Sequence, residues 1–332
     1  MLTPPFAEIN AAIAKHQKFA IVAHVGPDGD AIGSGLALGL ALKSMGKNAV
    51  VISTDGVPAM CRFLPQWETV ARELPRGFKP QCIFILDCDG SPERVAAPKG
   101  MVETAPYRVL IDHHRSTRPD FEVNWIDISQ PATAQMIFQL AEQMPIEITP
   151  DIAQCLMTGL STDTGHFRFT NVTPETFRAA ARLTECGADG AVIAFKTFDE
   201  RSFESTQVLG MALSKMQSGS DGQLMWVALA AKDFEGAGED SSENVVNFLR
   251  NVRGARMAIM MKEKGDDNGI VTRISVRSEA VLRADLFCAK FSGGGHAAAA
   301  GGRIRDKSFE ESVKIVVQAA CDWLAEEHPD SA

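Results

Sequence analysis

Four short apolar segments in the first part of the chain constrain its fold more than any other feature. Each has the length of a β-strand and is nearly all apolar, as strands buried on both faces of a parallel sheet are. The segments cover residues 19–24, 49–53, 82–87 and 107–112, and a helical pattern at 35–46 separates the first two. Strands that alternate with helices form βαβ units, so we predict an α/β domain with a parallel sheet and helices on both faces.

Acids and histidines follow these strands at the ends where such sheets bind ligands. A further apolar segment, residues 152–160, leads to another acid in "GLSTDTGHFRF". We therefore expect four separate segments to place carboxylates and imidazoles at one edge of the sheet. The residues concerned are His24, Asp28, Asp30, Asp87, Asp89, Asp112, His113, His114 and Asp163.

The segment "HVGPDGD" (residues 24–30) crowds one imidazole and two carboxylates into a tight loop. Such groups repel and desolvate one another unless a cation lies among them, so a divalent metal is the natural remedy. A lone D-x-D is more often a turn or a helix cap, and Asp89 has a simple role at the start of a turn. With Asp87, His113 and Asp163 the set reaches two imidazoles and four carboxylates, enough for two cations that share a carboxylate. Mixed nitrogen and oxygen ligands suit Mn²⁺.

The whole chain has the length of two domains and the composition of an ordinary globular protein, with 332 residues of which 45% are hydrophobic and 23% are charged. It has no apolar run long enough to cross a bilayer, and its first residues lack the pattern of a signal peptide, so we expect a cytoplasmic protein without membrane partners. Its seven cysteines contain no C-x-x-C pair. This suits reduced core residues better than disulfides or a structural zinc site.

The second half carries its own elements. We predict a helix with Thr173 as N-cap and Gly187 as stop, then a helical connector, then strands at 224–230, 255–264 and 269–278 and a last helix capped by Ser308. The predicted domains are residues 1–190 and 217–332, joined by the connector 191–216. The formal net charge of −9 argues against coating of long nucleic acid. However, residues 250–305 hold eleven Lys or Arg against five Asp or Glu, an excess that is either a solvated basic face or a site for an anionic substrate.

Several motifs together resemble a known family. "HVGPDGDAIGS", "ILDCDG", "DHH" and "GLSTDTGHFRF" resemble the successive motifs of the DHH phosphoesterase superfamily, and "FSGGGHAAAAGG" resembles the glycine-rich signature of the attached DHHA1 domain. The resemblance covers roughly residues 10–325. The length and the lack of extra domains are similar to the compact bacterial nanoRNase group, whose members act as oligoribonucleases and as phosphatases of 3′-phosphoadenosine 5′-phosphate (pAp). The fold implied is a catalytic DHH domain, a connector helix and a smaller α/β DHHA1 domain for substrate binding.

The resemblance also implies roles for individual residues. One Mn²⁺ would be held by His24, Asp28 and Asp87. The other would be held by Asp30, Asp87, His113 and Asp163, with Asp87 bridging the two and with Mg²⁺ or Co²⁺ as substitutes. Asp112 and His114 would orient the metal ligands or act on the substrate phosphate. The residues implied for substrate binding are Arg277, Ser278, Gly293, Gly294, Gly295 and His296. Arginine makes bidentate contacts to phosphate, and glycine backbone approaches anions closely; the alternative for the glycines is a flexible linker.

We therefore predict a manganese-dependent phosphoesterase in which two cations activate a water against short RNA or DNA oligonucleotides and pAp. A homodimer is compatible with this function. Rival substrates are cyclic or linear dinucleotides, longer single strands and inorganic pyrophosphate. The stretch "EAVLRADLF" after Arg277 and Ser278 departs from the family pattern and leaves base and length preference open. A rival of another class is a non-catalytic nucleotide-binding regulator, which would have lost metal ligands, and none is missing here.

Overall fold

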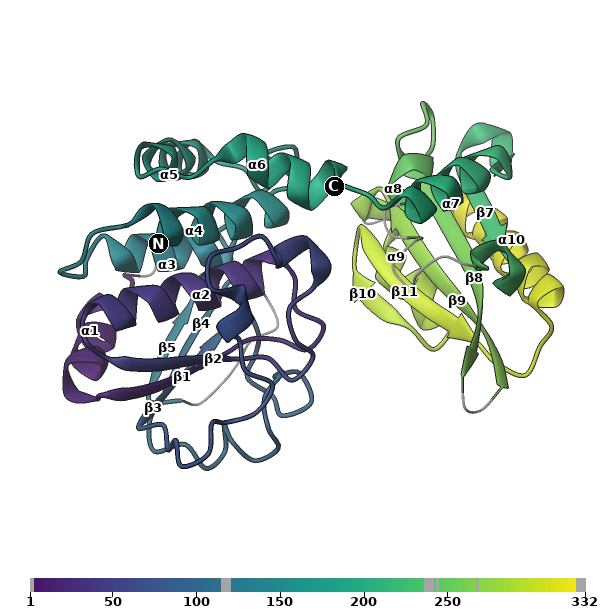
Figure 1. Cartoon of the computed structure of the whole chain (residues 1–332). Coiled ribbons are helices and arrows are strands. Elements are labelled where there is room, and N and C mark those ends of the chain that lie inside the picture. The colour runs from purple at the N-terminus through teal and green to yellow at the C-terminus, as the bar shows by residue number, and fades with distance from the viewer. Residues whose placement is uncertain (1–2, 115–120, 236–241, 243–244, 267–268, 327–332) are drawn as a thin grey trace. The chain divides into compact units, whose positions relative to one another are not determined.

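The chain forms two compact units, Met1–Glu200 and Arg201–Ala332 (Figure 1). The structure, a computed structural model, describes residues 3–114, 121–235, 242, 245–266 and 269–326, without the side chains of Asp266 and His296. Each unit has its own sheet and its own hydrophobic core. Among the described helices, none is both long enough and apolar enough to cross a lipid bilayer.

The first unit is built on a five-stranded, all-parallel sheet of order β2-β1-β3-β4-β5, which confirms the predicted α/β class. Its strands are β1 (Lys18–Val22), β2 (Asn48–Ile52), β3 (Cys82–Leu86), β4 (Arg108–Asp112) and β5 (Val123–Ile126). Four of them coincide with the predicted apolar segments. The fifth, at one edge, was not predicted, because it is short and alternates buried Val123 and Trp125 with exposed Asn124.

Helices cover one face of this sheet, whereas helices on both faces were expected. They are α1 (Phe6–Lys15), α2 (Gly29–Ser44), α3 (Thr133–Ala141), α4 (Pro150–Asp163), α5 (Pro174–Glu185) and α6 (Gly190–Ala194), with short 3₁₀ helices η1 (Ala59–Cys61) and η2 (Trp67–Thr69). Figure 1 shows α2, α3 and α4 on the same side of the strands. The opposite face is covered by irregular chain, in which Val95, Met101 and Val102 fill the core. Prolines and glycines in the stretch "DGSPERVAAPKG" explain why no helix forms there.

Two helices lie unusually close together, and this packing positions the candidate site. A Cβ at Gly33 of α2 would overlap the carbonyl oxygen of Cys155 on α4, and one at Gly159 would lie 2.7 Å from Asp30 Oδ1. Only glycine allows this approach. Helix α2 begins at Gly29, earlier than predicted, because Asp28 caps it. Helix α4 ends at Asp163, so the first turn of α2 and the last turn of α4 reach the same sheet edge.

The second unit is built on a six-stranded mixed sheet of order β10-β11-β9-β8-β7-β6, in which only β7 and β8 are parallel neighbours among the described pairs. Its strands are β6 (Gln217–Gly219), β7 (Leu224–Leu229), β8 (Met257–Asp266), β9 (Gly269–Ser278), β10 (Gly294–His296) and β11 (Ala299–Ile304). Its helices are α7 (Phe203–Ser214), α8 (Val245–Arg250), α9 (Ala284–Ala289) and α10 (Phe309–Ala325), with 3₁₀ turns η4 (Ser220–Gly222), η5 (Ala231–Phe234) and η7 (Ala280–Leu282).

The two faces of this second sheet bury different cores. Residues such as Ile259, Ile274 and Val276 pack with α9 and α10, whereas Ala258 and Met260 pack with α7 and α8. Residues 191–216 are divided between the units. The end of α6 and a π-helical turn, η3 (Phe195–Asp199), belong to the first unit, and α7 belongs to the second.

Candidate metal centre

The loop after β1 brings His24 and Asp28 to the carboxyl edge of the first sheet. Asp28 is the N-cap of α2, and its Oδ1 accepts hydrogen bonds from the backbone N–H groups of Asp30 and Ala31, both at 3.0 Å. The same oxygen lies 3.7 Å from His24 Nε2. The other ring nitrogen of His24 lies 2.9 Å from the carbonyl oxygen of Val25, which orients the ring. Asp28 can therefore cap helix α2 and also be a metal ligand, so the two interpretations of the D-x-D pattern do not exclude each other.

Asp30 is fully buried and is supported by the N-terminus of α3. Its Oδ2 accepts from Thr133 N at 2.6 Å, and its Oδ1 accepts from Ala134 N at 2.8 Å. Backbone donors at a helix N-terminus stabilise a carboxylate that water cannot reach. Burial and the nearby charges of Asp87 and Asp163 nevertheless raise the pKa of Asp30 well above its ordinary value. The backbone donors hold the carboxylate in place, and a cation beside it would offset the energetic cost of its burial.

Asp87, directly after β3, lies between two imidazoles. Its Oδ2 is 3.4 Å from His24 Nε2, and its Oδ1 is 3.3 Å from His113 Nε2. Burial alone would raise the pKa of Asp87, but the two imidazoles outweigh it and lower this pKa. The hydroxyl of Thr133 also donates a hydrogen bond to Asp87 Oδ1, at 3.0 Å. Each oxygen of one carboxylate thus faces a different histidine.

His113 and Asp163 complete this side of the site. His113 Nε2 lies 3.2 Å from Asp163 Oδ2 and 3.9 Å from Asp30 Oδ2, while its Nδ1 lies 3.2 Å from the carbonyl oxygen of Gln130. Burial lowers the pKa of His113, but Asp163, Asp87 and Asp30 outweigh it and raise the pKa to about 12. The pKa of Asp163 rises to about 6, chiefly through burial. Although carboxylates surround it, Nε2 of His113 is buried and makes no well-aligned hydrogen bond with any described residue.

These residues fit two divalent cations. His24, Asp28 and Asp87 form one group, and Asp30, His113 and Asp163 form another, with one possible ligand atom from each residue of a group within 4.8 Å of the others. Burial lowers the pKa of His24, but Asp28 and Asp87 outweigh it and raise the pKa to about 11. The buried Nε2 of His113, which lacks a hydrogen-bond partner among the described residues, is the donor atom that a metal would take up.

His114 and Asp112 stand beside these groups as a coupled pair. His114 Nδ1 lies 2.7 Å from Asp112 Oδ1, and the same oxygen accepts from the backbone N–H of His114 at 3.2 Å. Because a carboxylate only accepts, we assign the proton of this contact to Nδ1. Asp112 raises the pKa of His114. His114 also belongs to a third possible ligand group with Asp87 and His113.

Sequence reasoning missed the supporting residues. Thr133 contacts Asp30 through its backbone and Asp87 through its hydroxyl, although nothing in the pattern around it marks a site. Asn171 donates to the carbonyl oxygens of Pro131 and Asp163, linking the segments that precede α3 and follow α4. Asp89 takes no part in the clusters, because its Oδ1 accepts from the backbone and hydroxyl of Ser91.

The residues predicted to bind substrate lie in the second unit. Arg277 on β9 donates through Nε to Asn247 Oδ1 of α8 at 3.1 Å, and burial lowers its pKa. Ser278 is buried, and its hydroxyl donates to the carbonyl oxygen of Glu279 at 3.0 Å. Arg277 is therefore partly exposed on the sheet, whereas Ser278 is buried.

The predicted glycine-rich loop is in fact the start of a hairpin, because Gly294–His296 pairs with β11. A Cβ at Gly293 would overlap the carbonyl oxygen of Gly301, and one at Gly295, with φ of +146°, would lie 2.6 Å from the carbonyl oxygen of Ala299. These two glycines allow close packing of backbone on backbone. Gly294 is exposed, and a Cβ there would meet nothing within 4 Å. The side chain of His296 lies outside the described part of the structure.

Comparisons with known families and relatives agree over most of the chain. Residues 18–160 match the family described as "DHH family, N-terminal domain", and residues 225–326 match the "DHHA1 domain". The chain is 33% identical to the bifunctional oligoribonuclease and PAP phosphatase NrnA of Thermus thermophilus, over 92% of this chain and 89% of that protein. It is 24% identical to the protein of the same name from Bacillus subtilis, over 97% and 99%.

Solved structures show the same fold. An exopolyphosphatase-related protein from Bacteroides fragilis is similar with a TM-score of 0.88 and 25% identity, over 97% of each chain. The exonuclease RecJ bound to manganese is similar with a TM-score of 0.56 and 14% identity, over 98% of each chain. The fold is therefore one that proteins with very different sequences share.

Proposed function

The chain belongs to the DHH family, and from this premise we propose that it is a metal-dependent phosphoesterase that hydrolyses short oligonucleotides and pAp. Relatives that match nearly the whole chain carry the name of oligoribonuclease and PAP phosphatase. The proposed division of labour follows the two units. The first holds the cations and the second recognises the substrate.

The carboxylate of Asp87 is the single observation that carries this proposal. Its two oxygens lie 3.4 Å from His24 Nε2 and 3.3 Å from His113 Nε2, so one residue joins two groups of possible ligands. A turn or a helix cap has no need of such an arrangement. It suits a pair of cations that share a bridging carboxylate, the design of many enzymes that cleave phosphoesters.

We propose Mn²⁺ as the preferred ion, with Mg²⁺ or Co²⁺ as substitutes, because the ligands are imidazoles and carboxylates without thiolates. Two bound cations would supply a nucleophilic water near neutral pH and neutralise charge on the phosphoryl oxygens. The chain's own residues do the rest. Thr133 and the N-terminus of α3 hold Asp87 and Asp30 in place, and Asp112 orients His114 so that its Nε2 can act on the phosphate or the departing oxygen.

In the second unit, Arg277 is the residue that we expect to bind a substrate phosphate. Its Nε is held by Asn247 of α8, so the guanidinium is oriented before substrate arrives, and less entropy is lost on binding. The exposed Gly294 is a second candidate contact. A guanidinium recognises a phosphate group whatever base it carries, which suits substrates of mixed sequence.

The test is a substrate panel with controlled metal content. Full-length protein is treated with chelator, checked by elemental analysis, and supplied with Mn²⁺, Mg²⁺, Co²⁺ or Zn²⁺. Each sample is incubated with a dinucleotide, a pentanucleotide, a long single strand, pAp and a cyclic dinucleotide. We expect no turnover without metal, the best recovery with Mn²⁺, and faster cleavage of the short strands and pAp than of the long strand or the cyclic compound.

Two results would contradict the proposal. Full activity in verified metal-free protein would exclude the metal centre. Saturable binding of nucleotides without hydrolysis under every metal would favour a regulatory protein. Preference for the cyclic dinucleotide or the long strand would keep the chemistry and replace the substrate.

A further inference from the structure

Three cations lie side by side across the second sheet. Arg303 of β11 is paired with Arg273 of β9, and Arg273 is paired with Lys262 of β8. Paired residues in a sheet point to the same face, with their Cβ atoms about 5 Å apart. Over β8, this face is covered by α8. The ammonium group of Lys262 donates a hydrogen bond to Ser242, just before that helix. Along β9 from Arg273 to Arg277, and along β11, the side chains of this face are partly or fully exposed.

The two arginines of this row are exposed, and neither forms an ion pair with any residue in the described part of the chain. Like charges at directly opposite positions of a sheet destabilise the pairing. Most basic side chains elsewhere in the unit have partners, such as Arg256 with Glu279 and Arg283 with Asp285. A bound anion would relieve this repulsion, so the face favours binding of a negatively charged ligand.

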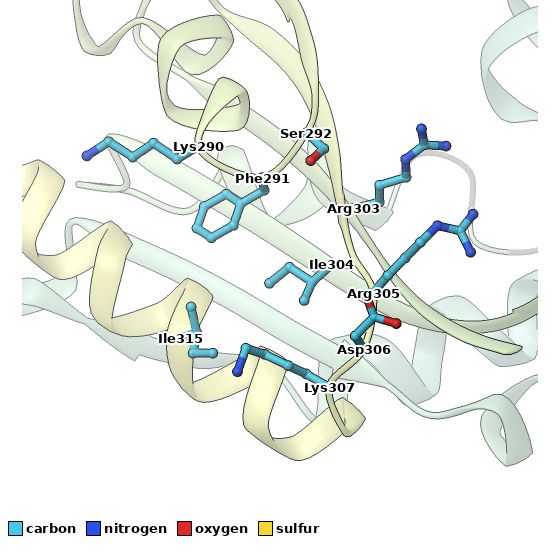
Figure 2. Close-up of a pocket in the computed structure, with 9 residues that line it drawn as sticks. All are labelled: Lys290, Phe291, Ser292, Arg303, Ile304, Arg305, Asp306, Lys307 and Ile315. Carbon is cyan, nitrogen blue, oxygen red and sulfur yellow. The ribbon is translucent and has the colours of Figure 1, made fainter. Parts of the chain in front are cut away.

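The neighbouring cavity is a poor site for such an anion. It has a volume of about 540 Å³ and an apolar floor of Phe291, Ile304 and Ile315 (Figure 2). Of its lysines, Lys290 lies 4.3 Å from the centre of the Trp323 ring and Lys307 forms an ion pair with Glu311. Figure 2 shows that Arg303 and Arg305 extend to the opposite side of the strand from Ile304. Arg303 and Arg305 therefore line the edge of the cavity, while their charged ends extend away from its apolar floor.

The row continues toward the proposed substrate residue. Arg277 lies four positions beyond Arg273 on β9, and alternation places both on the same face. At the rise of a β-strand the two positions are about 13 Å apart. Ser275 lies between them on β9, and the residues of β11 paired with Ser275 and Arg277 are the small residues Gly301 and Ala299. Because Arg277 is held by Asn247, a ligand with several phosphates in series fits this spacing better than a single phosphate does.

We propose that Arg273 and Arg303 bind the phosphodiester backbone of a single-stranded oligonucleotide longer than a dinucleotide, along a track that starts at Arg277. This inference rests on the proposed function, since it extends the same substrate class. The repeated negative charge of such a strand matches a row of cations separated by small side chains. Contacts of this kind are independent of base, so the track selects for length and not for sequence.

The test compares two double variants of the metal-loaded full chain. Arg273→Gln with Arg303→Gln removes the track, and Lys232→Gln with Arg253→Gln removes the same charge from exposed positions elsewhere in the second unit. Stopped-flow anisotropy with a labelled hexanucleotide measures binding before turnover, at several salt concentrations. Steady-state hydrolysis of a dinucleotide gives kcat and KM for the same samples.

We expect the track variant to bind the hexanucleotide about tenfold more weakly, with a slope of log affinity against log salt reduced by about 1.4, the value for two lost phosphate contacts to a single strand. Dinucleotide kcat and KM should stay unchanged, and the control pair should behave as wild type. Relief of the opposed charges should also leave the thermal midpoint unchanged or raise it. A lower midpoint with unchanged affinity would mean that the arginines serve the fold.

Equal losses in both double variants would reduce the effect to overall charge and overturn the proposal, as would hexanucleotide binding that does not change. If wild type cleaves neither substrate, the proposed function fails, but the stopped-flow measurement still decides whether the track binds. If the double variant aggregates, the single variants Arg273→Gln and Arg303→Gln carry the same comparison.

Discussion

The two units handle charge in opposite ways. In the first, buried carboxylates are surrounded by imidazoles and backbone donors, so that Asp30 and Asp87 are positioned before a cation arrives. In the second, Arg273 and Arg303 face solvent and each other without ion pairs among the described residues. The two units therefore differ in the precision that their roles require. Bond cleavage requires atoms held within fractions of an ångström, whereas attraction of a charged strand requires only charge within reach.

The largest expected effect comes from the carboxylate shared by both ligand groups. Asp87→Asn keeps the shape of the side chain but removes its negative charge, and we expect turnover to fall by roughly a thousandfold or more, since loss of a bridging ligand costs several kcal/mol. Metal content by elemental analysis and dinucleotide turnover are measured together. Asp89→Asn, two residues away and paired with Ser91, is the matched control and should retain activity. Equal losses in the two variants would remove Asp87 from the centre of the site.

A smaller effect is expected from the hydroxyl that supports this carboxylate. Thr133→Val preserves shape but removes the Oγ1 contact to Asp87, and loss of such a support typically costs about 10- to 100-fold in metal affinity or activity. Thr133→Ser retains the hydroxyl and should recover most of the loss. Titration with Mn²⁺, followed by activity, separates weaker metal binding from slower chemistry. If valine and serine behave alike, the hydroxyl has no role.

The second unit should respond differently. Arg277→Gln is expected to raise KM for a dinucleotide by about tenfold, the worth of one charge-assisted contact, while metal stoichiometry and kcat stay near wild type. Arg253→Gln, an exposed arginine of the same unit, is the control. A loss of bound metal in Arg277→Gln would break the division between a unit that holds cations and a unit that recognises phosphate.

The smallest effect is one of stability. Ser308 caps α10 by accepting from Glu311 N at 3.2 Å, so Ser308→Ala should lower the free energy of unfolding by about 1 kcal/mol without changing turnover. Ser308→Thr retains the cap and should match wild type. Chemical denaturation gives the free energies. A change in metal affinity in the alanine variant would show that the two units are more strongly coupled than their separate cores suggest.

Much of the first unit could be predicted from sequence, because strands buried on both faces are continuous apolar runs and the residues after them are easy to read. The histidines and acids predicted to meet at the sheet edge do meet there, apart from Asp89. Thr133 could not be found in this way, since its position depends on where α3 begins relative to Asp30 and Asp87, a tertiary relation that no local pattern encodes. Strand β5 was missed because a short edge strand with an exposed Asn124 has a weak apolar signal.

The second unit was harder to predict for a physical reason. The stretch around Gly293 and Gly295 contains the residues expected of an anion-binding loop. Its glycines also allow the close backbone packing of a hairpin, so the same sequence is compatible with both structures. The arginine row could not be read from spacing. Arg273 and Arg303 are thirty residues apart in the chain, and only the register of β9 with β11 sets them opposite each other.

The backbone of Asp87 has a consequence for how this position can vary. Its φ of +58° lies in the left-handed region, which glycine, asparagine and aspartate enter with the least strain. Glycine and asparagine would preserve the turn after β3 but lack the carboxylate, and glutamate would restore the charge at the expense of the turn. No single substitution meets both demands. We therefore expect no functionally neutral substitution at residue 87. A related protein that lost this aspartate would be expected to keep the fold and lose the catalytic activity.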